Sequence, residues 1–322
     1  MVIPLYNKEH YVARAIQSVF DQTFQDFEII IVDDGSTDRS MEAVKNFDDP
    51  RIHLISQKNA GVSAARNKGI SEAQYTLISF LDADDYWEKD FLATMWRLYE
   101  KYENCSVFAV NYRILLNNGT MQTPIINGLP EDFREGVLND YFQIAAKSDP
   151  IICSISFAVK KNAIEAIDGF PLSIRAGEDL LTWAKLAAHF DIAYSLEPKA
   201  VFSREEASPD AMPRIPDTHD KVGEGLRALL LSGNTNRISG LKEYIAYWHK
   251  IRVAIFLRLG MQKEARKEFY KMSEFAHKDL KYFVYALLVF SPNWMSKGLE
   301  AFVSWVNIYR RKYLSNGNGG NL

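Results

Sequence analysis

The stretch LISFLDADDYW, from Leu77 to Trp87, begins as an apolar strand and ends with three carboxylates, Asp82, Asp84 and Asp85, within four positions. Two carboxylates about 5 Å apart repel each other by roughly 3 kcal/mol at an effective dielectric constant near 20. The stretch therefore predicts that something positive binds at the end of this strand. The alternative is an acidic loop in which Asp85 caps the helix that follows Glu88.

Short β-branched runs alternate with helical patterns on the amino-terminal side of this strand. The apolar runs are VIPL, FEIIIVDD, IHLIS and TLISFLD, and the helical patterns between them cover residues 10–21, 41–47 and 63–73. This alternation is typical of a Rossmann-like α/β fold with a mostly parallel sheet and helices on both faces. Such sheets bind ligands beyond the carboxyl ends of their strands. Polar residues follow three of these strands, namely Tyr6 and Asn7, then Asp33, Asp34 and Gly35, then the aspartates after Leu81.

The pattern loosens after the fourth strand. SVFAVNYRILL (106–116) and IICSISFAVKK (151–161) each predict a strand, and the second leads into a helix at Asn162. Glu178 and Asp179 are expected to open a helix after a glycine- and proline-bearing loop. The polar segment 203–220 reads as a linker or mobile loop, and the chain beyond Lys221 is helical in period.

The charge distribution supports two regions. Residues 216–322 contain 17 Lys/Arg and 9 Asp/Glu, whereas residues 1–215 contain 21 and 32, so the net charges are +8 and −11. We predict an α/β domain over 1–215, a helical region over 216–315 and a disordered tail over 316–322. An acidic first region argues against a nucleic-acid partner. The basic second region could contact an anionic membrane surface or form a homo-oligomer.

Cysteine usage and hydropathy suggest a cellular location. Cys105 and Cys153 have neither a zinc-site nor a disulfide-framework spacing, so we expect two small core residues in a reducing compartment. The longest apolar run, Tyr282–Phe290, is far short of the roughly 20 residues that a membrane span needs. The expectation is a cytoplasmic protein, with peripheral contact to the inner face of the plasma membrane through its carboxy-terminal helices.

Five ordered motifs between residue 1 and about residue 205 resemble the inverting glycosyltransferases of family 2, whose nucleotide-sugar fold is named GT-A. The motifs are VIPLYN, IIIVDDGSTD, NAGVSAARNKGI, FLDADD and GEDLL. The resemblance implies transfer of a hexosyl or N-acetylhexosaminyl group from a nucleotide-diphosphate sugar, with UDP expected, to a hydroxyl of a glycan or lipid-linked acceptor in cell-surface polysaccharide synthesis. No QxxRW follows the Glu-Asp pair, which argues against a processive synthase. Only Met1 and Val2 precede Ile3, fewer apolar residues than the first strand of this family normally has, so the given start could be a truncated one.

The resemblance assigns the carboxylates after Leu81 to a divalent cation. Asp82 and Asp84 correspond to the DxD pair, with Asp84 the more direct ligand of Mg²⁺ or Mn²⁺, because hard cations prefer carboxylate, phosphate and water oxygens. A cation that clamps both phosphates would stabilise the departing nucleotide. Asp85 is expected either to cap the next helix or to touch a metal-bound water.

The same resemblance assigns nucleotide-binding residues: Pro4, Tyr6, Asp33, Asp34, Arg66 and Asp82. It places Asp34 against the base ring, where a carboxylate accepts the N3 hydrogen of uracil or thymine. Two of these assignments have plain alternatives, a helix cap for Asp33 and a surface salt bridge for Arg66.

Catalysis is assigned to the Glu178–Asp179 pair. An inverting transfer needs a base that accepts the proton of the acceptor hydroxyl, and the family pattern gives this role to Asp179. Glu178 would orient or bind the acceptor. Alternatively, both are first-turn residues that the helix dipole favours.

Two other classes of function compete with this reading. A nucleotidyltransferase also grips a nucleotide through metal and carboxylates, but PLYNKEH lacks the lysine- and glycine-rich loop that holds a triphosphate. A dinucleotide oxidoreductase would need GxGxxG after the first strand. A third alternative is not an enzyme but a non-catalytic scaffold that binds a nucleotide sugar. In the tail, Leu299, Phe302, Val303, Val306 and Tyr309 form an apolar stripe, which reads as a core face or as an interfacial helix.

Overall fold

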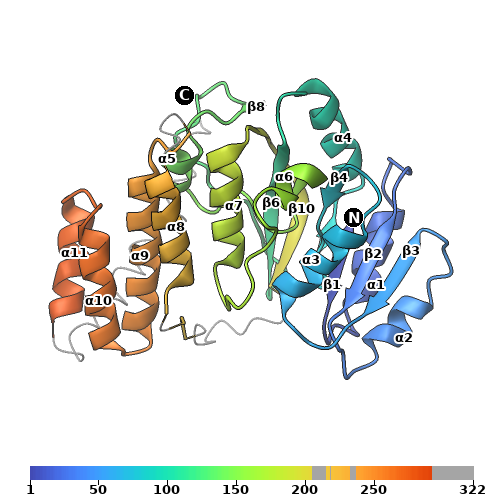
Figure 1. Cartoon of the computed structure of the whole chain (residues 1–322), viewed down its shortest axis with the longest axis horizontal. Helices are drawn as coiled ribbons and strands as arrows, with labels where there is room; N and C mark the ends of the chain where they lie inside the picture. The colour runs from blue at the N-terminus through green and yellow to red at the C-terminus, as the bar shows by residue number, and fades with distance from the viewer. Residues whose placement is uncertain (205–214, 218, 233–236, 292–322) are drawn as a thin grey trace, which may run out of the picture. The chain divides into compact units, whose positions relative to one another are not determined.

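The structure is a computed structural model of the 322-residue chain, and it describes residues 1–204, 215–217, 219–232 and 237–291 (Figure 1). The chain forms two compact units, one of residues 1–209 and 220–241 and the other of residues 210–219 and 242–322. Helix α8 (Lys221–Ser232) belongs to the first unit. A compact unit is defined by packing and not by activity, so the functional boundary at residue 215 stays a prediction.

The first unit begins with a three-stranded parallel sheet, as the alternating pattern predicts. Its strands are β1 (Val2–Leu5), β2 (Ile29–Asp33) and β3 (Ile52–Ser56), in that order across the sheet. The connecting helices are α1 (Val12–Phe20), α2 (Ser40–Lys45) and α3 (Val62–Glu72). β1 and β2 are fully buried, which explains their unbroken apolar runs. Gly69 lets α3 lie close to β1, because a Cβ there would be 2.2 Å from a methyl carbon of Val2.

A mixed seven-stranded sheet follows in the same unit. Its order is β4-β9-β6-β10-β5, with β7 paired to β6 and β8 to β10. The bounds are β4 (Leu77–Ser79), β5 (Tyr86–Trp87), β6 (Val107–Leu116), β7 (Met121–Gln122), β8 (Glu135–Val137), β9 (Phe157–Lys160) and β10 (Ile192–Arg204). β6 and β10 are parallel, and the other pairs are antiparallel.

Backbone contacts join the two sheets where β4 ends. Val2 forms an isolated parallel bridge with Phe80, and the Leu81 N–H donates to the Val2 carbonyl at 3.0 Å. The end of β4 therefore lies beside the start of β1, and the residues that follow β4 run parallel to β1. This junction brings the aspartates after Leu81 to the edge where the loops after β1 and β2 begin.

The sequence expectations were incomplete for two of these strands. β10, which pairs with β5, β6 and β8, was not anticipated, because Glu197-Pro198-Lys199 interrupts its alternation. The pairing of β10 with β6 shifts register on both sides of Pro198. The strand predicted over 151–161 is wrong in its first half, since only Phe157–Lys160 is extended in the sheet. Residues 151–156 instead form a turn in which the Cys153 N–H donates to Ser156 Oγ at 2.9 Å.

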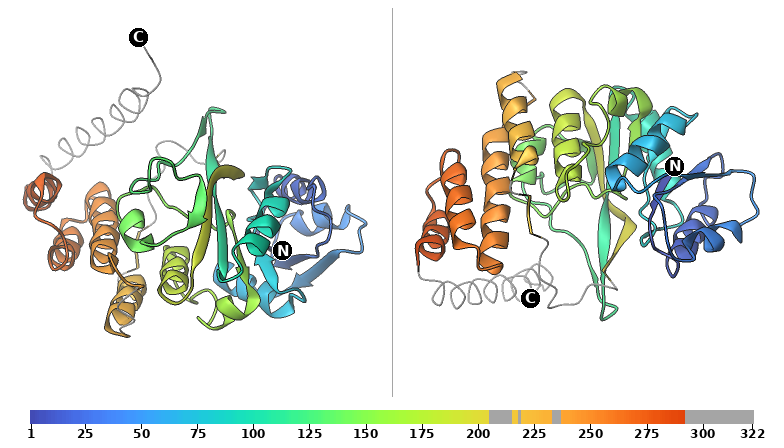
Figure 2. Two further views of the ribbon diagram at one scale, coloured as in Figure 1. Left: turned by 90° about the horizontal axis from the view of Figure 1, so that it is seen from above. Right: turned by 60° about the horizontal axis from the view of Figure 1, so that its bottom comes forward.

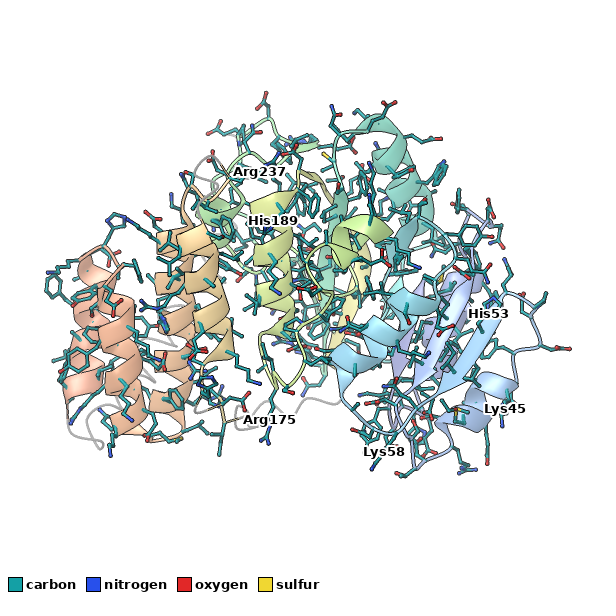
Figure 3. The ribbon with its side chains drawn as sticks, in the orientation of Figure 1. Lys45, His53, Lys58, Arg175, His189 and Arg237 are labelled. Carbon is teal, nitrogen blue, oxygen red and sulfur yellow. The ribbon has the colours of Figure 1, made fainter. Side chains whose placement is uncertain are left out.

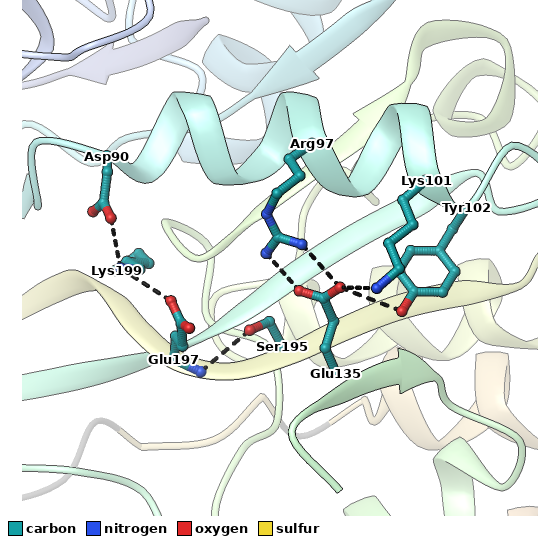
Figure 4. Close-up of polar contacts among 8 residues, drawn as sticks. All are labelled: Asp90, Arg97, Lys101, Tyr102, Glu135, Ser195, Glu197 and Lys199. Carbon is teal, nitrogen blue, oxygen red and sulfur yellow. Dashed lines mark hydrogen bonds and ion pairs between the residues drawn. The ribbon is translucent and has the colours of Figure 1, made fainter.

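The remaining helices of the first unit are α4 (Phe91–Lys101), α5 (Tyr141–Ala145), α6 (Lys161–Glu165) and α7 (Glu178–His189), and Figure 2 gives two further views of the fold. α4 is tied to the strands by charge (Figure 4). Glu135 on β8 accepts from Arg97, Lys101 and Tyr102, and Lys199 on β10 lies 2.6 Å from Asp90. These contacts lie outside the carboxylate cluster after Leu81.

The second unit is helical, as predicted, and contains nearly all of α9 (Leu241–Arg258), α10 (Gln262–Ser273) and α11 (Leu280–Phe290). Glu268 is buried between His249, at 2.7 Å, and Arg252, at 3.1 Å. Burial alone would raise the pKa of Glu268, but these two partners lower it to about 2. No helix in the described ranges is long and apolar enough to cross a bilayer. The predicted stripe over 299–309 and the predicted disordered tail lie outside the described residues.

Candidate active site

The loops after β1 and β2 are interlocked by side-chain hydrogen bonds. Asn7 Oδ1 accepts from the Thr37 N–H at 2.8 Å, and Ser36 Oγ accepts from the Asn7 N–H at 3.1 Å. Asn7 adopts a positive φ of 50°, which an asparagine tolerates better than most residues. The two loops therefore present a common rim at the sheet edge. Tyr6 is 47% exposed on this rim, whereas Pro4 is buried in β1 opposite Val32.

The two aspartates at the end of β2 are buried and have different partners. Asp33 Oδ1 accepts from the Ser36 N–H at 3.2 Å, within its own turn. Asp34 accepts from Gln57 Nε2 at 2.7 Å and from the N–H groups of Ala60 and Gly61 at 2.9 and 2.8 Å. An ionised carboxylate offers about four lone pairs, so about one is left on Asp34. Its contact with the base ring stays a prediction.

Arg66, on α3, is paired with Asp82. Arg66 Nη2 lies 2.7 and 3.0 Å from the two carboxylate oxygens of Asp82, and Ser154 Oγ donates to Asp82 Oδ2 at 2.8 Å. The guanidinium lies 5.1 Å from the centre of the Phe170 ring and is 3% exposed. The arginine therefore does form an ion pair with a carboxylate, but in the interior and not at the surface.

The same guanidinium reaches toward Glu178, the neighbour of the predicted base Asp179. Arg66 Nη1 lies 3.8 Å from Glu178 Oε1, beyond hydrogen-bond distance. Within the described part of the chain, its Nε and Nη1 atoms are buried without a hydrogen-bond acceptor. Unsatisfied buried donors on a charged group are costly, and they are often found where a ligand supplies the missing acceptor.

Glu178 and Asp179 open α7 directly after Gly177, which has a φ of 88°. Burial raises the pKa of Asp179, against the hydrogen bond that its Oδ1 accepts from the Leu180 N–H at 2.7 Å and against the charge of Arg66. Burial and the neighbouring Asp179 likewise raise the pKa of Glu178. The dipole at the start of α7, acting alone, would instead lower the pKa of both carboxyl groups. A base with a raised pKa binds a proton more strongly once it accepts one.

Asn67 holds the loop that precedes α7. Its Oδ1 accepts from the Phe170 N–H and its Nδ2 donates to the Phe170 carbonyl, both at 2.8 Å. Gly169 has a φ of 65°, and a Cβ at this position would lie 2.4 Å from Asn67 Oδ1. Asn67 therefore sets the distance between α3 and the loop. No sequence pattern pointed to this role, although Asn67 directly follows Arg66 in the third motif.

Asp84 and Asp85 lie in very different surroundings. Asp84 Oδ2 is 2.7 Å from Lys8 Nζ, and the Asp84 carbonyl accepts from Arg14 Nη2 at 2.7 Å. Asp85 is fully buried and accepts from the Ser203 N–H at 2.7 Å. Burial, together with the charges of Asp82 and Asp84, raises the pKa of Asp85 well above its ordinary value.

The predicted cap by Asp85 is wrong, because α4 begins at Phe91 and the preceding residue is Asp90. With no exposed surface, Asp85 is also badly placed to touch a metal-bound water. Cys105 is buried in the core, as expected, and Cys153 is partly buried and packs against the same core. Burial and the neighbouring Asp85 raise the pKa of the Cys153 thiol. The contacts of Ser154 and Lys8 with the aspartates were not anticipated, because they connect distant parts of the sequence.

The donor set at this edge fits a hard divalent cation. Carboxylates of Asp82 and Asp84 supply oxygen ligands, which Mg²⁺ and Mn²⁺ prefer. The Asp84 side chain is 32% exposed and Asp82 is 21% exposed, so both are reachable from solvent. Each already holds a cationic side chain, which indicates that this edge attracts positive charge.

A family model described as Glycosyl transferase family 2 matches residues 1–166. The chain belongs to glycosyltransferase family 2. Two bacterial relatives illustrate the family. GlyA of Streptococcus pneumoniae serotype 4 is 40% identical over 105 residues, covering 32% of this chain and 15% of GlyA. TuaG of Bacillus subtilis, a glycosyltransferase assigned to teichuronic acid biosynthesis, is 30% identical over 199 residues, covering 61% of this chain and 74% of TuaG.

Solved structures confirm the predicted GT-A fold for this family 2 chain. Staphylococcus aureus TarS 1–349 in complex with UDP-GlcNAc superposes with a TM-score of 0.64 at 17% identity, over 84% of this chain and 80% of TarS. The mannosyltransferase PcManGT from Pyrobaculum calidifontis, in complex with GDP-Man and Mn²⁺, superposes with a TM-score of 0.55 at 17% identity. The superposition covers 96% of this chain and 85% of PcManGT. By sequence, the matched regions span only 15% to 30% of the length of GlyA and of two Rickettsia glycosyltransferases.

Proposed function

We propose that the chain is a metal-dependent, inverting and non-processive glycosyltransferase that moves a sugar from a UDP-sugar to a hydroxyl of a glycan or lipid-linked acceptor. The observation that carries the proposal is the position of Arg66, which contacts Asp82 at 2.7 Å and approaches Glu178 to 3.8 Å. The buried guanidinium of Arg66 thereby lies between the DxD aspartates and the Glu178–Asp179 carboxylates. A transfer reaction needs both groups of carboxylates around one reacting centre.

Donor binding is proposed for the sheet edge. Tyr6, Asp33 and Asp34 lie where the loops after β1 and β2 begin. Arg66 has two donors without acceptors that suit a diphosphate. Asp84 would be the direct ligand of Mg²⁺ or Mn²⁺ and Asp82 a second ligand, and the chemistry supplied there is stabilisation of the charge on the departing diphosphate. The Mn²⁺ complex of PcManGT supports the use of a divalent cation.

The proton of the acceptor hydroxyl is proposed to go to Asp179. Its raised pKa makes it a stronger base than an exposed aspartate, while Arg66 provides a positive charge that opposes full protonation. Glu178 is proposed to orient the acceptor. Of the two carboxylates, Glu178 is the one closer to the Arg66 guanidinium, so its orientation is linked to the position of that group.

The UDP-GlcNAc complex of TarS supports UDP as the nucleotide, whereas the GDP-Man complex of PcManGT makes GDP the necessary comparison. The relationship to TuaG supports a role in cell-surface polysaccharide synthesis. A panel of UDP-, dTDP- and GDP-sugars, with Mn²⁺ or with EDTA, tests the proposal through metal-dependent hydrolysis or transfer. Binding of a nucleotide sugar without any turnover would favour a scaffold, and release of pyrophosphate from a nucleoside triphosphate would favour a nucleotidyltransferase.

A membrane contact of the helical unit is the last part of the proposal. On α11, Leu280, Phe283, Leu287 and Phe290 recur at helical spacing and are 81%, 57%, 54% and 48% exposed. Tyr270 on α10 lies beside them, with its ring centre 6.0 Å from that of Phe290. The guanidinium of Arg266 on α10 lies 5.8 Å from the centre of the Phe290 ring, and Lys263 and Lys267 are exposed on the same helix. An apolar face beside cations fits the interfacial region of an anionic bilayer.

A further inference from the structure

Lys8 forms an ion pair with the aspartate that is assigned as the direct metal ligand. Its Nζ lies 2.7 Å from Asp84 Oδ2, and the two side chains are 26% and 32% exposed. A solvent-reachable pair of this kind contributes only about 0–1 kcal/mol to folding. Folding stability is therefore a weak reason for placing a lysine on this carboxylate.

The main chain fixes both ends of the pair. The Lys8 N–H donates to Ser40 Oγ at 2.7 Å, and the Lys8 carbonyl accepts from Tyr11 and Val12 at the start of α1. On the other side, Arg14 holds the Asp84 carbonyl at 2.7 Å. Since both backbones are held, the contact can change only by rotation of the side chains, and the four-carbon stem of a lysine rotates easily.

The two cations at the DxD pair differ in how easily they can leave. Arg66 is 3% exposed, stacks on Phe170 and bonds both oxygens of Asp82. Lys8 contacts one oxygen of Asp84 from a partly exposed position. Asp84 is therefore the carboxylate that can exchange its partner, and Asp82 is the one with a permanent partner.

We propose that Lys8 is an internal counter-ion that a divalent cation must displace from Asp84. The inference rests on the proposed function, in which Asp84 binds the metal. A lysine ammonium and a divalent cation compete for the same carboxylate oxygens, so Lys8 weakens the binding of a free cation. When the cation arrives with a nucleotide diphosphate, the displaced ammonium has phosphate oxygens as a new partner. Lys8 therefore couples metal binding to donor binding.

The test measures Mn²⁺ binding to the full chain by electron paramagnetic resonance of free Mn²⁺, with and without UDP and corrected for the Mn–UDP complex. Lys8→Met should bind Mn²⁺ alone roughly two- to five-fold more tightly than the wild type, the range expected when one partly exposed ion pair no longer competes. UDP should then increase the Mn²⁺ affinity of Lys8→Met by a smaller factor than it does in the wild type. A purely structural role for Lys8 would weaken binding in both conditions.

Two matched variants control for the loss of one positive charge. Lys45→Met removes an exposed lysine at the end of α2, labelled in Figure 3, and Lys199→Met removes the partner of Asp90, drawn in Figure 4. Both should bind Mn²⁺ as the wild type does. Lys8→Arg keeps the charge, so its Mn²⁺ affinity without UDP should stay near that of the wild type. Circular dichroism melting of each variant checks the fold.

The proposal is overturned if Lys8→Met binds Mn²⁺ alone no more tightly than the wild type, or if Lys45→Met tightens binding equally. These outcomes leave the proposed function standing, provided that Asp84→Asn abolishes UDP-dependent Mn²⁺ binding. Absence of Mn²⁺ binding by the wild type even with UDP would instead remove the metal part of the proposed function, and the counter-ion role with it.

Discussion

Arg66 Nη2 lies 2.7 Å and 3.0 Å from the two carboxylate oxygens of Asp82, in a position where the arginine is 3% exposed. Removing one partner of a buried ion pair is expensive because the other charge stays desolvated. We expect Arg66→Met to lower the free energy of unfolding by about 3–5 kcal/mol. Urea denaturation measures this loss.

The double variant Arg66→Met/Asp82→Asn separates the structural from the functional role of this pair. With the stranded carboxylate removed, it should regain much of the stability that Arg66→Met loses, while turnover stays abolished. A double variant that is as unstable as Arg66→Met would mean that Asp82 is not the charge that Arg66 compensates.

Asp84→Ala should remove metal-dependent activity and leave the fold intact, because its carboxylate is partly exposed and pairs only weakly for stability. Sugar transfer with Mn²⁺ and the melting temperature are the two measurements. Asp90→Ala, which removes another lysine-paired aspartate, is the control and should keep its activity. Full activity of the wild type in excess EDTA would contradict the metal assignment.

Asp179→Asn should retain donor binding and lose transfer by roughly a hundred- to ten-thousand-fold, the usual cost of removing a general base. Glu178→Gln should cost less, since Asp179 would still accept the proton. Kinetics with a saturating donor distinguish the two. If Glu178→Gln were the less active variant, the two assignments would have to be exchanged.

The pH dependence of the wild type should reflect the raised pKa of Asp179. A base works only when it is deprotonated, so transfer should fall as the pH drops through a value above that of an ordinary aspartate. This acidic limb belongs to coupled carboxylates, so the profile reports an apparent pKa of the Glu178–Asp179 pair. A rate that stays constant down to the ordinary aspartate pKa would argue against Asp179 as the base.

Gly169→Ala should destabilise the loop before α7 for two reasons, its positive φ and the contact of the new Cβ with Asn67. Asn67→Ala relieves the contact but also removes two hydrogen bonds to Phe170, which are worth about 1 kcal/mol each. Unfolding free energies of the two single variants and the double variant form a cycle. A less-than-additive loss would assign part of the cost to the contact, and strict additivity would assign all of it to the backbone.

Vesicle binding tests the proposed membrane face of α11. The full chain should co-sediment with anionic vesicles more than with neutral ones, and less so at high salt. Phe283→Ser/Leu287→Ser should reduce this binding, whereas Leu231→Ser, which changes an 86% exposed leucine on α8, should not. Equal binding to both vesicle types, or dimers that disappear in the α11 variant, would favour a protein–protein contact.

The sequence was informative where chemistry and local pattern coincide. The buried runs of β1 and β2 and the ordered motifs predicted the α/β architecture, and the motifs also carried the family. Contacts between residues far apart in the sequence could not be predicted. Ser203 bonds Asp85 and Ser154 bonds Asp82 across wide gaps in sequence, and no local pattern marks either serine. Strand β10 was not predicted, because the register shifts on both sides of Pro198 and the alternation by which a strand is recognised is broken there.

The interlock of Asn7 with Ser36 and Thr37 affects the thermodynamics of recognition. Loops that are ordered before a ligand arrives lose little conformational entropy when it binds. We therefore expect nucleotide binding to have a small heat-capacity change and an association rate that is not limited by loop rearrangement. Asn7→Ala would loosen this rim, so its weaker affinity should come from a more unfavourable binding entropy and not from a lost contact with the ligand.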